Sequence, residues 1–160
     1  MVTEAIHAPA ARTLSTGPTA RLNRTQRTRA LAEFRYTLRR FLHFSEQAAE
    51  RAGLTPQQHQ LLLQIAGAPP DAVNTIGFLA ARLALKHHSL VELATRCEEA
   101  GWILRRPGTL DRRVVVLHLT VAGSRILHEL SEDHEQELHE LAPRLIQALG
   151  PFTRRPGARA

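Results

Sequence analysis

The 160-residue chain has a single cysteine, Cys97, so it cannot form an intramolecular disulfide. A lone thiol is typical of proteins in a reducing compartment. No apolar run approaches the ~20 residues that a membrane-spanning helix needs. The first residues show neither the basic region nor the apolar region of a secretory signal. These absences predict a cytoplasmic protein that does not enter a membrane.

The common catalytic and cofactor-binding motifs are missing as well. The sequence has no G-x-S-x-G, no H-E-x-x-H, no phosphate-binding loop and no C-x-x-C. We therefore expect no catalysis, no cofactor and no bound metal. The nine histidines leave one alternative open. It is a metal-binding protein or metal-dependent enzyme that uses His128, His134, His139 and nearby carboxylates.

The chain is basic, and its charges are segregated. The formal net charge is +6, and the isoelectric point is close to 11.1. Arginines gather in residues 12–29 and again in residues 105–113, whereas acidic residues gather in residues 129–140. A basic surface favours a polyanionic partner such as nucleic acid, although solvated arginines can also serve solubility alone. A nonspecific nucleic-acid binder is therefore a second alternative.

The stretch from Leu83 to Thr120 has the pattern of a helix followed by a β-hairpin. Gly101 ends the helix, because a residue without Cβ readily takes the left-handed conformation of a helix exit. Two β-type runs, Trp102–Leu104 and Val114–Leu119, then flank the turn-prone segment RRPGTLDRR. The buried stripe of the helix consists of Leu90, Leu93, Ala94 and Cys97. This order predicts a winged helix, whose helix enters a major groove and whose wing reaches a minor groove.

The same stretch resembles the DNA-binding core of the MarR family (multiple antibiotic resistance regulators). In that family a leucine-ending helix and a short turn precede the recognition helix. A glycine then leads into a wing with D-x-R, and L-T and a further glycine follow the second strand. The matching residues are Leu79, Ala80, Leu83, Arg96 to Gly101, Asp111-Arg112-Arg113, Leu119-Thr120 and Gly123. The resemblance covers residues 54–130 and implies a repressor that a small, often aromatic or anionic, molecule releases from DNA.

Periodicity outside this stretch completes a mainly α fold with a small β-hairpin. Apolar steps of three and four from Leu31 to Ala52 indicate a long helix, and Pro143 is expected to begin a final short helix. Both terminal regions carry more apolar surface than a small monomer exposes, which predicts a homodimer. The expected parts are a flexible basic arm (1–22), an N-terminal dimerisation helix (23–53), a winged helix-turn-helix domain (54–120), C-terminal dimerisation helices (121–150) and a flexible tail (151–160).

Threonines mark three of the expected helix starts. Thr55 precedes Pro56 and Gln58 in the pattern of a capping box. Thr75 and Thr120 are expected to cap the two helices that follow them. In the family, an acidic residue often stands at the position of Phe78 and completes a capping box with Thr75. Phe78 is therefore expected either to pack or to face a ligand or a neighbouring chain.

The face of the recognition helix opposite its apolar stripe supplies the candidate DNA contacts. Polar side chains there can bond to base edges, Val91 can touch a thymine methyl, and Glu92 can accept from cytosine N4. Lys86 is expected to meet phosphate, and Arg96 is left open between a DNA contact and an ion pair. The candidates are Lys86, His87, His88, Ser89, Val91 and Glu92.

In the wing, the resemblance implies that Asp111 orients Arg113 and that the Arg113 guanidinium enters a minor groove. Arg105, Arg106 and Arg112 are expected to contact phosphates. A two-fold dimer would present two recognition helices, so the expected partner is double-stranded DNA with a pseudo-palindromic operator.

A ligand site is expected on the first long helix. There, aromatic surface is combined with cationic or titratable groups, which suits an aromatic carboxylate or a phenol. The residues concerned are Tyr36, Arg39, Arg40, His43 and Phe44. The same residues could instead pack the dimer, and the sequence leaves both interpretations open.

Overall fold

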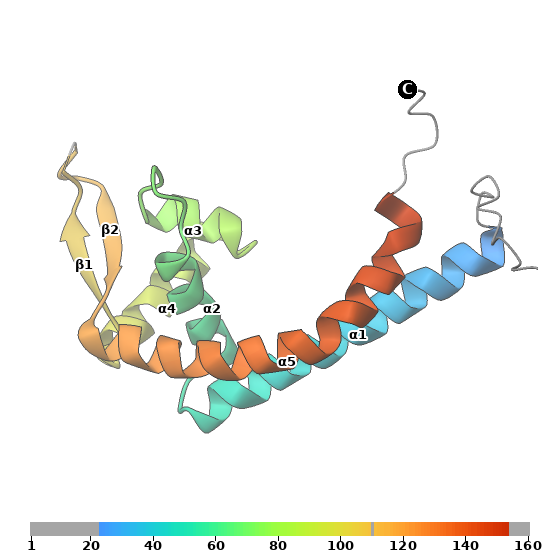
Figure 1. Ribbon diagram of the computed structural model, residues 1–160. Helices are drawn as coiled ribbons and strands as arrows, with labels where there is room; N and C mark the ends of the chain where they lie inside the picture. The colour runs from blue at the N-terminus through green and yellow to red at the C-terminus, as the bar shows by residue number, and fades with distance from the viewer. Residues whose placement is uncertain (1–22, 110, 154–160) are drawn as a thin grey trace, which may run out of the picture.

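The computed structural model of the chain describes residues 23–109 and 111–153 (Figure 1). The predicted basic arm and residues 154–160 of the predicted tail lie outside the described residues. The elements are α1 (Arg24–Arg51), α2 (Pro56–Ala66), α3 (Ile76–Arg82), α4 (His87–Glu99), β1 (Ile103–Pro107), β2 (Val115–Leu119) and α5 (Val121–Thr153). The predicted fold class, mainly α with one β-hairpin, is confirmed. None of these helices combines the length and apolar character needed to cross a membrane.

The elements form two parts (Figure 1). Helices α2, α3 and α4 and the hairpin form what we call the winged lobe. Helices α1 and α5 lie side by side and extend away from that lobe. They run in opposite directions, because Ala30 and Glu33 near the start of α1 share a cavity wall with Arg144 and Ala148 near the end of α5.

Helix α1 is bounded as its sequence predicts. Asn23 caps its start, accepting a hydrogen bond from the Gln26 N–H at 2.8 Å while the Gln26 side chain accepts from the Asn23 N–H at 2.9 Å. Gly53 has φ +80°, a left-handed conformation that ends the helical path after Arg51. Towards the C-terminal end of the predicted apolar seam, Ala48 is buried, whereas Leu31 near the start is 51% exposed. Much of the seam is therefore uncovered in one chain.

The threonine caps form as predicted. Thr55 and Gln58 complete a capping box with bonds of 2.9 and 3.2 Å. Thr75 accepts from the Phe78 N–H at 3.1 Å, and Thr120 accepts from the Gly123 N–H at 3.0 Å. Phe78 packs against the core, and its ring lies under the Arg82 guanidinium, 5.6 Å away.

The core of the winged lobe is built from the leucine-rich faces of α2, α3 and α4. The predicted stripe of α4 is confirmed, with each of its four side chains at most 1% exposed. These side chains belong to one cluster with Leu61, Leu62, Leu79 and Leu117. Burying one leucine stabilises a fold by roughly 2 kcal/mol, so the shared cluster holds α4 firmly in one rotation about its axis.

The strand boundaries differ from the prediction by a few residues. Trp102 and Val114 lie outside the strands, and β1 extends to Pro107. The Trp102 N–H donates to the Cys97 carbonyl in the turn that leaves α4, and the Val114 N–H donates to the Asp111 carbonyl in the wing tip. Both N–H groups are therefore used by turns and are not available for strand pairing.

The expectation that Pro143 begins a separate helix is wrong. Helix α5 continues through Pro143 as far as Thr153, although an interior proline removes one helix hydrogen bond and costs about 3 kcal/mol. Leu141 and Ala148, on either side of the proline, are both buried. Packing against α1 on both sides therefore keeps the helix intact, and Figure 1 shows α5 changing direction towards its C-terminal end.

Two histidines, the buried His59 and the half-buried His134, lie in contact where α1, α2 and α5 meet. His59 is 3% exposed, and its ring centroid is 4.9 Å from that of His134. The Leu130 carbonyl, which can only accept, contacts Nδ1 of His134. Nδ1 therefore carries a proton and donates, and Nε2 lies within hydrogen-bond distance of the Ser45 hydroxyl, at 2.7 Å. Burial, together with the nearby His134, lowers the pKa of His59 to about 4.

Mild acid should therefore destabilise the folded protein. As pH falls below 6.5 the unfolded chain protonates His59, while the folded chain resists protonation down to about pH 4. The free energy of unfolding should be unaffected by His59 above pH 6.5 and should fall between pH 6.5 and pH 4, by up to about 3 kcal/mol. Urea unfolding across this range measures the loss.

His59→Phe removes the titrating group and should flatten this part of the pH profile. His118→Asn, at an exposed position on β2, serves as the control and should keep the profile of the unsubstituted protein. Equal pH dependence in His59→Phe and the unsubstituted protein would contradict the assignment to His59.

Candidate nucleic-acid interface

Helix α4 presents the predicted contact residues outward because its opposite face is buried. Five of the six candidates are exposed, and Ser89 is half-buried. Lys86 occupies the N-cap position and makes no side-chain capping bond. Within the described part of the chain, the first N–H groups of α4 thus have no side-chain acceptor. They follow Lys86 at the positive end of the helix dipole, which suits a phosphate.

The turn between α3 and α4 fixes where that face points. Ala84 adopts a left-handed conformation with φ +52°, which costs a residue with a Cβ roughly 1 kcal/mol. The Leu85 N–H donates to the Ala80 carbonyl at 2.9 Å and closes the turn. Leu83 and Leu85 on either side of Ala84 pack against the core. Core packing therefore offsets the strain at Ala84, which no sequence motif signals.

The wing and α4 share one hollow of about 390 Å³. His87 and Val91 line it from α4, and Arg113 and Val115 line it from the wing; Gly77 of α3 contributes to its wall. The structure thus brings together predicted contact residues that are more than 20 positions apart in the sequence. The hollow is open, so the recognition helix and the wing arginine face the same volume of solvent.

Asp111 orients the side chain of Arg113, which is called the wing arginine. The Arg113 N–H donates to Asp111 Oδ1 at 2.9 Å, and the Arg113 guanidinium donates to both carboxylate oxygens at 3.2 and 3.3 Å. These bonds lower the pKa of Asp111, so the carboxylate remains charged at neutral pH. The Arg113 side chain is nevertheless 92% exposed. Its guanidinium is oriented without being covered.

The other three wing arginines differ from one another. Arg106 and Arg112 are exposed and leave their guanidinium groups to solvent or phosphate. Arg105 is half-buried, and its guanidinium contacts Thr95 and the Val91 carbonyl on α4. Contact of any of the three with phosphate stays a prediction, and for Arg105 the guanidinium already has partners in the protein.

Contacts at the base of the wing explain why Thr120 and Gly123 stand where they do in the family motif. The Thr120 N–H donates to the Trp102 carbonyl at 3.0 Å, and the Thr120 hydroxyl donates to the Gly101 carbonyl at 2.7 Å. A Cβ on Gly123 would lie 2.0 Å from the same Trp102 carbonyl oxygen. Only glycine therefore allows the start of α5 to approach the base of the wing this closely.

Cys97 lies inside the winged lobe and is fully buried. Burial raises the pKa of its thiol to about 11. The thiolate, which is the reactive form, is therefore scarce at neutral pH. This agrees with the predicted role of Cys97 as a small apolar side chain.

The residues predicted to bind a ligand are not gathered into one cavity. Tyr36, Arg40 and His43 are exposed on α1, and His43 lies 3.2 Å from Gln47 of the same helix. Phe44 is half-buried, and its ring meets that of His134 edge-on at 5.7 Å. These residues do not enclose a site within the described part of one chain. The ligand site therefore stays a prediction.

Two other cavities lie at the junction of the winged lobe with α1 and α5. One of about 250 Å³ is lined by Ser45 of α1, His59 of α2 and Leu83. The second, of about 480 Å³, is lined by Phe41, His59 and His134. His59 borders both cavities, and neither is lined by Tyr36, Arg40 or His43. Sequence reasoning missed His59, because a histidine among leucines carries no motif.

The histidines proposed for a metal site are separated on α5. His128 pairs with Glu132 at 3.5 Å and His139 pairs with Glu135 at 3.7 Å, both on the exposed surface. His134 points inward to Ser45. Across residues 23–109 and 111–153, no three His, Cys, Asp or Glu side chains are close enough to hold a metal ion. The metal-binding alternative therefore has no geometric support there.

Comparison with known proteins identifies the winged lobe. Residues 52–114 match the model of the MarR family. The match spans 63 of the 160 residues, so it shows that the winged lobe resembles the MarR family. MarR family proteins are DNA-binding transcription regulators rather than enzymes, and the matched residues include α2, α3, α4 and the tip of the wing.

Three relatives show how far the likeness extends. A Thauera aromatica protein, named as a transcriptional regulator of the hcr operon, is 27% identical over 108 residues, which cover 68% of this chain and 63% of that protein. The chain thus matches less than two thirds of that relative's length. AbsC of Streptomyces coelicolor, a MarR family transcriptional regulator, has a TM-score of 0.63 and 22% identity, covering 84% of this chain and 96% of AbsC. An E. coli MarR mutant in complex with operator DNA has a TM-score of 0.61 and 23% identity, covering 74% and 84%. The two structures show that the fold is shared.

The wing arginine gives a direct test of the interface. Arg113→Ala should weaken binding to an operator duplex by ~1–3 kcal/mol and make its salt dependence shallower. Thermal stability should not change, because the Arg113 side chain is 92% exposed. Titrations of a duplex selected from random DNA, at several salt concentrations, measure both effects.

Arg35→Ala is the matched control, since it removes the same charge from an exposed position on α1, outside the winged lobe. It should leave operator affinity unchanged. If Arg113→Ala binds as tightly as the unsubstituted protein, Arg113 makes no contact with DNA.

Proposed function

We propose that this protein is a cytoplasmic, homodimeric repressor of the MarR family that binds a pseudo-palindromic operator. The observation that supports this most directly is the hollow shared by His87, Val91 and Arg113. A recognition helix and a wing arginine that face the same volume can engage a major groove and a neighbouring minor groove together. Lys86, His88, Ser89 and Glu92, with Arg106 and Arg112, complete the proposed contact surface.

The dimer is proposed from apolar surface that one chain leaves uncovered. Helices α1 and α5 expose large apolar side chains by 37% or more: Leu31, Tyr36, Leu38, Leu42, Leu138, Ile146, Leu149 and Phe152. A soluble monomer rarely exposes a large contiguous apolar surface. A second copy with the same two helices would cover these side chains and relate two winged lobes by a two-fold axis.

The dimer and its operator can be tested together. Sedimentation at micromolar concentration should show a dimer, and the footprint on a duplex selected from random DNA should contain two half-sites about 10 bp apart. Ile146→Glu should give monomers that protect one half-site weakly, because Ile146 is 70% exposed in one chain and would be buried by the second.

Val121→Glu is the matched control, because Val121 is an 89% exposed residue at the opposite end of α5. It should stay dimeric. A monomeric unsubstituted protein would contradict the proposed dimer. Equal binding to all duplexes would instead support a nonspecific nucleic-acid binder.

We also propose that a small aromatic or anionic molecule releases the repressor from DNA. Tyr36, Arg40 and His43 are exposed on α1, and a second copy packed beside them would convert this surface into an enclosed site. Phe44, on the same helix, connects this surface with His134, because the two rings meet edge-on. Such a ligand acts through its different affinities for the arrangements with and without DNA.

Screening aromatic acids and phenols by thermal shift, then by release of the operator duplex, should yield hits that Arg40→Ala and His43→Ala weaken. Glu50→Ala, at an exposed position about two turns after His43 on the same helix and outside the lining of both cavities beside His59, serves as the control. Hits that release DNA equally well from all variants would place the control site elsewhere, for example in the cavities beside His59.

A further inference from the structure

Arg105 lies on the face of the hairpin that covers α4. In the β1–β2 register it stands opposite Leu117, and directly opposed residues project from the same face of a sheet. Leu117 is fully buried, and the Arg105 side chain is only 30% exposed. The Arg105 side chain is therefore directed into the contact between the hairpin and the recognition helix.

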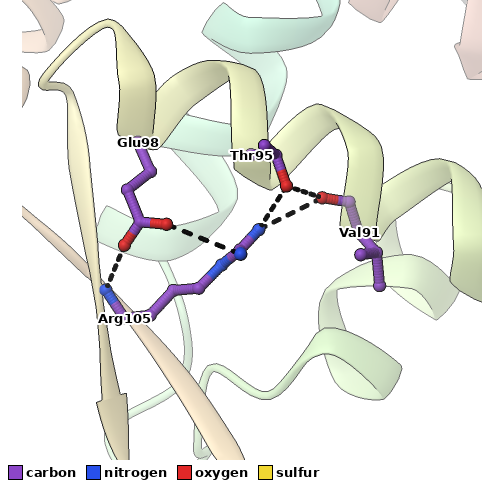
Figure 2. A network of polar contacts seen from close by, with 4 residues as sticks. All are labelled: Val91, Thr95, Glu98 and Arg105. Atoms are coloured by element: carbon purple, nitrogen blue, oxygen red, sulfur yellow. Dashed lines mark hydrogen bonds and ion pairs between the residues drawn. The ribbon is translucent and has the colours of Figure 1, made fainter.

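Four contacts tie Arg105 to α4 (Figure 2). Its Nη2 donates to the Thr95 hydroxyl oxygen at 2.9 Å and to the Val91 carbonyl at 3.2 Å. Its Nη1 lies 3.5 Å from Glu98 Oε2, and its backbone N–H donates to Glu98 Oε1 at 3.2 Å. One strand residue thus holds two successive turns of the recognition helix.

These contacts compete with the phosphate role expected from the sequence. The Arg113 guanidinium is paired with Asp111 within the wing itself, and it is almost fully exposed, so its open side can meet an anion. The Arg105 guanidinium has both terminal nitrogens engaged, and its Nε is buried with no hydrogen-bond partner among residues 23–109 and 111–153. Reaching a phosphate would break the bonds to Thr95 and Val91, so Arg105 serves the protein's own geometry.

We propose that Arg105 is a positioning residue that sets the orientation of α4 relative to the wing, and with it the preference for one DNA sequence. This proposal rests on the proposed DNA-binding function. Val91, whose carbonyl accepts from Arg105, is itself a proposed base contact. Recognition surfaces need placement within about 0.5 Å, so loss of this tie should reduce sequence preference more than general DNA affinity.

Arg105→Met tests the proposal, because it keeps side-chain length and removes the guanidinium. It should weaken binding to the duplex selected by the unsubstituted protein by about 10-fold or more, and binding to a scrambled duplex by less than about 2-fold, with no change in salt slope. Its melting temperature should stay close to the original, because the Glu98 carboxylate that loses its partner is 40% exposed and keeps the bond from the backbone N–H of residue 105.

Arg106→Ala is the comparison, because Arg106 is the exposed neighbour on the same strand. It should weaken both duplexes alike and make the salt slope shallower by about 0.9, as loss of one phosphate contact does. Thr95→Val should reproduce part of the Arg105→Met effect, and adding it to Arg105→Met should cause little further loss, because the two residues form one contact.

Three results would overturn the proposal. They are an equal loss on both duplexes with a shallower slope in Arg105→Met, an unchanged preference for the selected duplex, and additive effects of Thr95→Val and Arg105→Met. Failure of the proposed function looks different, because the unsubstituted protein itself would then prefer no duplex.

Discussion

The burial of one face of α4 is the constraint on which the winged lobe depends. With Leu90 and Leu93 inside, helical periodicity leaves Val91 and Glu92 no direction but outward. A rotation of α4 by one residue would expose the leucines and drive Glu92 towards an apolar core, where an unpaired charge is strongly unfavourable. The residues proposed to read DNA are thus held in place by side chains that never meet it.

A second constraint lies at the junction of the lobe with α1 and α5. His59 borders both junction cavities, and burial keeps its imidazole neutral. A molecule that enters either cavity would therefore meet a hydrogen-bonding ring without a charge. An anion would gain no ion pair from His59, so the cationic surface of α1 around Arg40 is better suited to an anionic ligand.

Features governed by local periodicity and capping could be predicted from the sequence. The α4 stripe, the Thr55 cap and the Gly53 stop each depend on residues within one or two turns. Features governed by distant packing could not. Helix α5 continues through Pro143 because it packs against α1 on both sides of the proline. The Arg105 side chain lies against α4 because Arg105 projects from the same face of the hairpin as the buried Leu117. The acidic Glu98, placed just before an arginine-rich strand, was the one available signal of that contact.

The close approach of Gly123 to the Trp102 carbonyl has a mechanical consequence. Because no side chain separates them, the first turn of α5 is pinned to the base of the wing and can act as a fulcrum. Helix α5 has 33 residues, so it is about 50 Å long, and a tilt of about 5° at this point moves its far end by about 4 Å. A small change in the angle between the wing and α5 is therefore accompanied by a displacement of several ångströms at the distant end of α5.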